Sequence, residues 1–96
     1  MRKIRLLKVE EREDTLVPNN IPVGAERFGY MRIPPKIGNF FLLFNEAGLP
    51  IFHTSLVKTI EENFIGEKKS KTYLKTLNSV YKIEYLEEEN QTVNQN

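Results

Sequence analysis

Apolar and polar residues alternate along several short segments of this chain, as they do in strands that bury one face. The alternation is clearest in "SVYKIEYL" (79–86), where Tyr81, Ile83 and Tyr85 share one parity and charged residues fall between them. A shorter run in "RKIRLLKV" (2–9) has Ile4 and Leu6 separated by a basic residue. Both segments predict half-buried strands, and we expect Tyr81, Ile83 and Tyr85 to point inward.

Two further segments predict strands from their composition. "RFGYMRI" (27–33) contains aromatic residues, which favour strands, and Gly29 within it predicts either a bulge or a close backbone approach. "FFLLFN" (40–45) is almost entirely apolar, so it predicts a strand that is buried on both faces. Pro34-Pro35 and Gly48 mark the breaks between these segments and their neighbours.

The segment 55–66, "SLVKTIEENFIG", has two interpretations. Its β-branched residues, which include Val57 and Thr59, favour a strand. Alternatively, Ser55 is placed to cap a short helix in which Ile60 and Phe64 lie one turn apart. The pattern alone leaves both open.

Two polar pairs, Thr54-Ser55 and Asn78-Ser79, each precede a short apolar run. Side chains of these types form hydrogen bonds with nearby backbone and stabilise turns and bulges. We therefore interpret both pairs as structural, at points where a strand turns a corner or changes its partner.

Short strands separated by turn residues are typical of small β-barrels and β-sandwiches. We predict an all-β barrel or sandwich of five to six antiparallel strands, with one short helix if the helical alternative at 55–66 holds. A chain of 96 residues, 40% of them hydrophobic, suffices for one small packed domain. We expect that domain to span residues 1–86, and the polar segment 87–96 to be a disordered tail.

Composition and charge narrow the function. The net charge is +1, there is no cysteine, and the longest apolar run, Phe40–Phe44, is far shorter than the roughly 20 residues of a membrane span. No apolar leader follows the basic residues at the start of the sequence. These features predict a soluble, cytoplasmic protein that does not bind a membrane.

We find no arrangement that predicts catalysis. His53 is the one histidine, and Ser55 lies two positions away. No carboxylate is identified that would orient the His53 ring so that it could activate Ser55 as a nucleophile. The acids at 10–14 and at Glu61-Glu62 lie in polar stretches and lack the spacing of a calcium loop, and the glycines lack the spacing of a phosphate loop. We therefore expect no enzymatic activity, no catalytic residue, no metal and no cofactor.

The chain resembles a group of small uncharacterised β-proteins of bacterial phages and mobile elements. The recurring pattern is Thr-Ser-x-Val-x-x-Ile followed by Thr-x-Asn-Ser-x-Tyr, and the residues that match it are Thr54, Ser55, Val57, Ile60, Thr76, Asn78, Ser79 and Tyr81. The resemblance implies a compact β module and implies no activity, cofactor or ligand-binding residue.

We predict a non-enzymatic binding or accessory protein of a phage or mobile element that acts through a protein partner. Small β modules often bind partners at an exposed strand edge or through an aromatic loop, although Pro34-Pro35 can equally serve only as a break that protects a strand edge. Tyr30, Met31 and the segment "RIPPKIG" (32–38) are candidates for such a surface.

The alternative is a small nucleic-acid-binding barrel. Aromatic side chains can stack on bases while neighbouring lysines neutralise phosphates. Phe28 and Tyr81 are additional candidates for stacking, and the main group lies around a predicted hairpin at Gly66: Lys68, Lys69, Lys71, Tyr73 and Lys75. Lysines and exposed aromatics on one concave face would favour this function, whereas an apolar and neutral patch would favour the protein partner.

Overall fold

The computed structural model of the chain describes residues 1–12 and 21–86, and its secondary structure there consists of strands and turns. The predicted all-β fold is confirmed. There are six strands: β1 Arg2–Glu11, β2 Glu26–Met31, β3 Phe40–Phe44, β4 Pro50–Ile65, β5 Lys68–Thr76 and β6 Ser79–Tyr85. Because β4 runs without a break through residues 55–65, the helical alternative for this segment is wrong. The tail at 87–96 lies outside the described residues.

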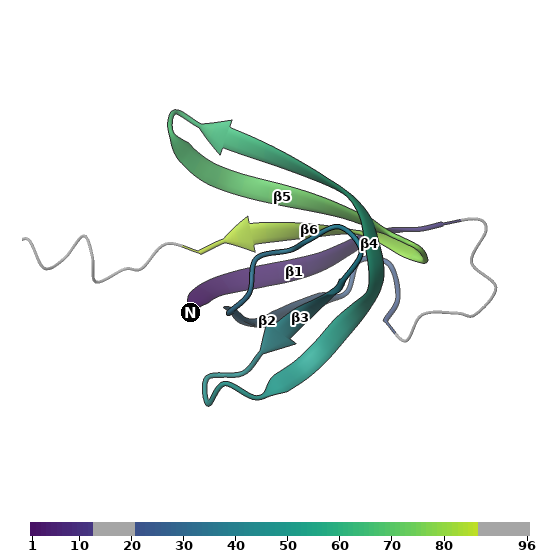
Figure 1. Cartoon of the computed structure of the whole chain (residues 1–96), viewed down its shortest axis with the longest axis horizontal. Coiled ribbons are helices and arrows are strands. Elements are labelled where there is room, and N and C mark those ends of the chain that lie inside the picture. The colour runs from purple at the N-terminus through teal and green to yellow at the C-terminus, as the bar shows by residue number, and fades with distance from the viewer. Residues whose placement is uncertain (13–20, 87–96) are drawn as a thin grey trace, which may run out of the picture.

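The strands form one closed barrel in which each strand pairs with the next along the chain, and β1 also pairs with β6 (Figure 1). All of the pairs are antiparallel. Closure is tight between β1 and β6, where the register runs from Ile4↔Tyr85 to Glu11↔Ser79. It is thinnest between β2 and β3, which share the single pair Tyr30↔Phe44.

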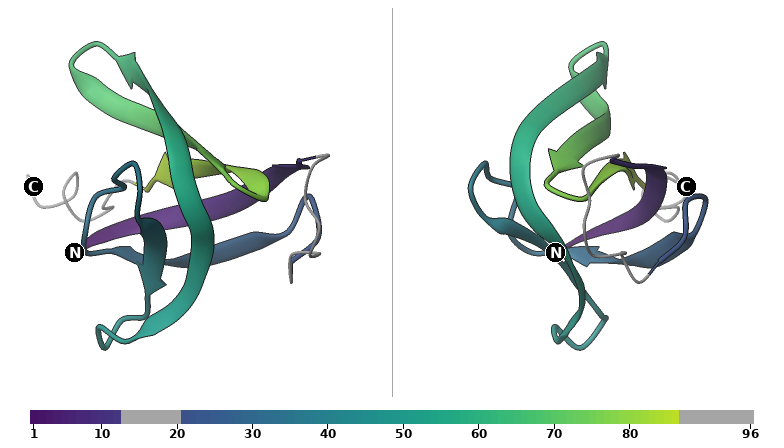
Figure 2. Two further views of the ribbon diagram at one scale, coloured as in Figure 1. Left: turned by 45° about the vertical axis from the view of Figure 1, so that its right-hand side comes forward. Right: turned by 90° about the vertical axis from the view of Figure 1, so that its right-hand side faces the viewer.

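The long strand β4 pairs with two neighbouring strands. Its first part, from Pro50 to Leu56, pairs with β3, and its second part, from Val57 to Ile65, pairs with β5. The register shifts between Val57 and Thr59, at the change of partner. Bulges bend a strand and increase its twist, and β4 appears in Figures 1 and 2 as one strongly curved strand.

The core lies inside the barrel and is built by the alternating residues. Tyr81 and Ile83 of β6 are completely buried, and Ile4 and Leu6 of β1 are at most 1% exposed. Tyr85 is half-buried, and its hydroxyl lies 2.6 Å from Thr72 Oγ1. The inward orientation predicted from "SVYKIEYL" is therefore confirmed. Burial of side chains of this size contributes about 1.5–3 kcal/mol each to folding.

Gly29 lies where β3 crosses close to β2. A Cβ atom at this position would lie 2.7 Å from the carbonyl oxygen of Phe44 and 2.9 Å from Cγ of Leu43. Of the two explanations that the sequence allows for Gly29, the structure shows the close backbone approach. The β1–β2 register passes through Ile4↔Gly29 without a shift, so there is no bulge at this glycine.

Strand β3 is buried on one face. Phe41 and Leu43 are in the core and Phe44, at the end of the strand, is also buried, whereas Phe40 is 54% exposed and Leu42 is half-buried. The prediction that "FFLLFN" is buried on both faces is wrong, because the outer face of β3 borders a loop and not a second layer of the fold.

The two polar pairs lie at junctions of the barrel. The Thr54 hydroxyl accepts a hydrogen bond from the backbone N–H of Phe41 (3.1 Å) and donates one to the Ser55 carbonyl (2.7 Å). The Ser55 hydroxyl accepts one from the backbone N–H of Asn78 (3.1 Å), in the turn between β5 and β6. In that turn, the backbone N–H of Ser79 donates to the Thr76 hydroxyl (3.1 Å). Thr54 thus replaces a ladder bond where the β3–β4 register shifts.

Candidate functional site

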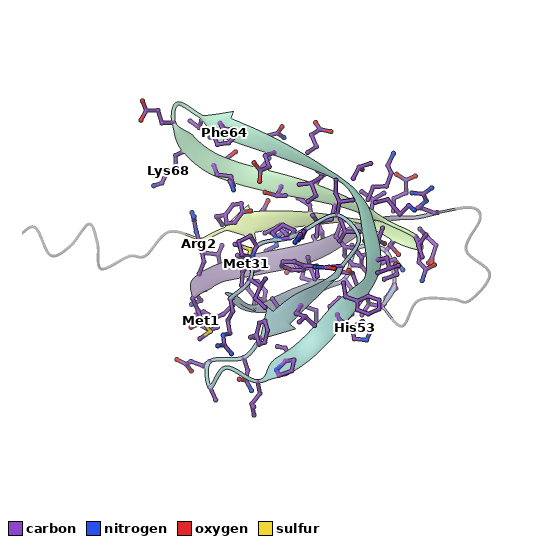
Figure 3. All side chains as sticks on the ribbon, in the orientation of Figure 1. Met1, Arg2, Met31, His53, Phe64 and Lys68 are labelled. Atoms are coloured by element: carbon purple, nitrogen blue, oxygen red, sulfur yellow. The ribbon has the colours of Figure 1, made fainter. Side chains whose placement is uncertain are left out.

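The lysines around the β4–β5 hairpin lie on different faces. Lys71, Tyr73 and Lys75 alternate with the buried residues of β5, so their side chains point out of the barrel. Lys69 instead forms an ion pair with Glu62 (3.0 Å) and lies 5.9 Å from the centre of the Tyr85 ring. Lys68 is exposed beside the hairpin turn (Figure 3).

Acidic residues lie among the outward-facing cations. Glu84 is the register partner of Lys71, and its carboxylate lies 2.8 Å from Arg5 and 3.4 Å from Lys82. Arg5 also pairs with Glu26 at 3.2 Å. The outer face of β5, β6, β1 and β2 is therefore a mosaic of both signs of charge and not a basic face.

The candidate stacking residues are also separated. Tyr81 has no exposed surface and cannot meet a base. Phe28 is 56% exposed, but it lies on β2, with β1 and β6 between it and Tyr73 on β5. Only Tyr73, half-buried between Lys71 and Lys75, combines an aromatic ring with neighbouring lysines.

His53 has structural neighbours. Its Nδ1 lies 2.9 Å from the Thr54 carbonyl oxygen, and its ring packs at an angle of 53° against Phe40, with centroids 5.4 Å apart. The Ser55 hydroxyl accepts a hydrogen bond from the Asn78 backbone N–H (3.1 Å). Within residues 1–12 and 21–86, no group of three or more histidine and acidic residues could hold a metal ion.

The surface that the structure assembles most clearly is an apolar pocket of about 310 Å³ on the outside of β3. We call it the β3 pocket. Its wall comes from the loop between β2 and β3 and from β3 and β4, and it is lined by Ile33, Pro34, Lys36, Gly38, Asn39, Phe40, Leu42 and Leu56. Ile33 and Phe40 are both more than half exposed, as is the neighbouring Ile37.

Backbone hydrogen bonds hold the loop that forms this pocket. The N–H of Gly38 donates to the Val57 carbonyl (2.8 Å), and the N–H of Val57 donates to the Asn39 carbonyl (3.0 Å). Asn39 in turn donates to the Lys36 carbonyl (3.1 Å). Gly38 has φ +93°, a conformation that glycine adopts without strain. These bonds fix the loop to β4, so the pocket is formed before any ligand arrives.

The charged residue among those that line the β3 pocket is Lys36. The Arg32 guanidinium donates to the Gly48 carbonyl (3.3 Å) and lies over the Phe44 ring. Lys36, which lines the pocket, is the cation closest to a bound group.

The "RIPPKIG" segment contributes to this pocket, as expected of a docking surface, but Tyr30 and Met31 do not line it. Met31 packs against the core, and Tyr30 pairs with Phe44. Sequence reasoning missed Phe40, Leu42 and Leu56. The available signal was the uniform hydrophobicity of 40–44, which exceeds what one buried face of a strand requires.

Comparisons with protein-family models, with curated proteins and with solved structures found no match to this chain. No helix that could span a membrane occurs in the part of the chain that the structure describes.

Proposed function

We propose that this chain is a non-enzymatic binding or accessory protein of a phage or mobile element, and that it acts through a protein partner at the β3 pocket. The observation that supports the proposal is the exposed, preformed apolar pocket beside Phe40. Exposed apolar groups gathered around a concave site are typical of interaction surfaces. The resemblance of residues 54–81 to small phage proteins supports the biological setting.

The pocket favours one kind of partner. Its volume of about 310 Å³ suits one large apolar side chain, and anchors of this kind dominate the affinity of many protein interfaces. Lys36 at its wall favours a carboxylate next to that anchor. The ligand we propose is therefore a segment of another protein with an aromatic or branched apolar residue beside an aspartate or glutamate.

Replacing Phe40 with serine should abolish binding at this pocket while leaving the fold intact, because the Phe40 ring is more than half exposed. We expect at least a tenfold loss of affinity, since central aromatic residues of interfaces contribute about 2 kcal/mol or more. Peptides selected from a random display library with the native protein as bait would serve as ligands, and their affinities for native and variant protein would be compared.

The matched control is Leu77→Ser, which removes a similarly exposed apolar side chain from the β5–β6 turn. The selected peptides should bind this variant normally and should be enriched in an apolar residue next to an acid. Equal loss with both variants, or a set of selected peptides whose binding does not depend on Phe40, would contradict the proposal.

One observation favours the nucleic-acid alternative: Tyr73 lies between Lys71 and Lys75, with Lys82 opposite it in register. Because Glu84 and Glu26 lie on the same face, we expect a fluorescently labelled single strand to show no anisotropy change at low salt. Binding that weakens steeply with salt and disappears in Tyr73→Ser would instead establish the nucleic-acid function.

A further inference from the structure

The β4–β5 hairpin extends beyond the rest of the barrel. β6 pairs with β5 only from Lys71 to Lys75, whereas β4 and β5 stay paired as far as Ile65↔Lys68 (Figures 1 and 2). The strands are joined by a tight turn at Gly66, with φ +65°. Phe64 and Ile65, near the tip, are 53% and 74% exposed (Figure 3).

One edge of this hairpin has no neighbour among the described residues. β3 pairs with β4 only up to Leu56, and the backbone of Val57 bonds to Gly38 and Asn39. From residue 59 to residue 65, β5 is the only strand that the structure pairs with β4. The other side of this segment, which we call the β4 edge, is paired with no strand in residues 1–12 and 21–86, and its backbone groups can pair with another extended chain.

The charges of the β4 edge disfavour a second copy of the protein. Full antiparallel overlap of residues 59–65 with the same segment of another copy would place Glu62 opposite Glu62 of that copy. Like charges directly opposite each other destabilise a strand pair. The edge carries no cation between residues 59 and 65, and although Glu62 pairs with Lys69 (3.0 Å), the exposed Glu61 carboxylate can face a basic chain.

We propose that the β4 edge is a second protein-binding site, which adds an extended basic segment of another protein as an additional strand. Main-chain hydrogen bonds would supply much of the affinity, as in other cases of strand addition. A lysine or arginine would face Glu61 on one face of the strand, and apolar residues would cover Phe64 on the other face. This site is separate from the β3 pocket and does not depend on the function proposed there.

A short capped peptide that alternates lysine with valine or threonine would test this site. Titrated into the labelled protein, it should shift the NMR signals of residues 59–65 and leave those of the β3 pocket in place. The same peptide with alternate amides N-methylated, which cannot complete a strand ladder, should not bind. An acidic peptide of equal length should bind at least tenfold more weakly.

A charge-reversal variant tests the edge from the protein side. Glu61→Lys changes an exposed side chain and should weaken binding of the basic peptide about fivefold. Glu67→Lys makes the same charge change in the turn, beyond the edge, and should have little effect. Binding of the N-methylated peptide, equal effects of both variants, or a native dimer in sedimentation that Glu61→Lys dissociates would each overturn the proposal.

Discussion

Replacing Gly29 with alanine should destabilise the barrel by about 3 kcal/mol, because overpacking a tight site costs about this much. The new Cβ would lie 2.7 Å from the Phe44 carbonyl oxygen, a backbone atom, and 2.9 Å from the buried Leu43 side chain. Leu43 is completely buried, and a shift of the Phe44 backbone would break Tyr30↔Phe44, the single pair that the structure shows between β2 and β3. The strain therefore falls on the weakest seam of the barrel.

Urea unfolding followed by circular dichroism measures this effect. Arg27→Ala, an exposed change in the same strand, is the control and should alter the free energy of unfolding by less than about 0.5 kcal/mol. Gly66→Ala is a second control. A Cβ there meets no atom within 4 Å, so only its positive φ opposes alanine, at about 1 kcal/mol. If Gly29→Ala matched Arg27→Ala, the close approach of β3 would be contradicted.

The sequence was most informative where burial follows a local period. The inward residues of β6 and β1 are evident because a strand exposes alternate residues to opposite faces. The extent of β4 was not evident. The first part of β4 pairs with β3 and the second part pairs with β5. This change of partner depends on how segments far apart in the sequence meet.

Register explains why the lysine group was difficult to interpret. Residues 68–75 look uniformly basic in the sequence, yet pairing places Glu84 opposite Lys71. A shift between Asn63 and Phe64 accompanies the turn of Lys69 toward Glu62. Each bulge shifts the register and so decides which residues lie opposite each other. The residue pattern of the chain does not predict where these shifts occur.

The β3 pocket was predictable only in part. Pro34-Pro35 and Gly38 identified a loop, and the apolar run 40–44 identified a strand. That the loop folds back onto Val57, and so leaves the outer face of β3 as the floor of a pocket, follows from hydrogen bonds between segments far apart in the sequence.

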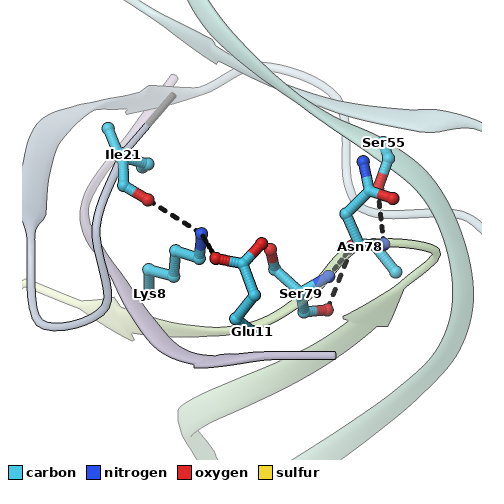
Figure 4. A network of polar contacts seen from close by, with 7 residues as sticks. Lys8, Glu11, Ile21, Ser55, Asn78 and Ser79 are labelled. Atoms are coloured by element: carbon cyan, nitrogen blue, oxygen red, sulfur yellow. Dashed lines mark hydrogen bonds and ion pairs between the residues drawn. The ribbon is translucent and has the colours of Figure 1, made fainter. Parts of the chain in front are cut away.

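In β1 the alternation of buried residues continues at a position where the sequence has a lysine, Lys8. It follows Ile4 and Leu6 on the inward parity and is completely buried. Its ammonium group donates to the Ile21 carbonyl (2.8 Å) and pairs with Glu11 (3.0 Å), at the end of the barrel that holds the β5–β6 turn (Figure 4). The lysine thus connects β1 to the chain that leads into β2.

Replacing Lys8 with alanine should lower the free energy of unfolding by about 2–4 kcal/mol. The loss combines a cavity in place of the buried side chain with the loss of the hydrogen bond from Lys8 to the Ile21 carbonyl and of the ion pair with Glu11. Lys8→Met, which keeps most of the volume, separates these two causes and should cost about 1–2 kcal/mol, the share due to the lost hydrogen bonds. Lys3→Ala, an exposed lysine on the same strand, should change stability by less than about 0.5 kcal/mol in the same urea titrations. If Lys8→Ala proved as mild as Lys3→Ala, the Lys8 side chain would not be buried, and the ammonium group would not hold this end of the barrel closed.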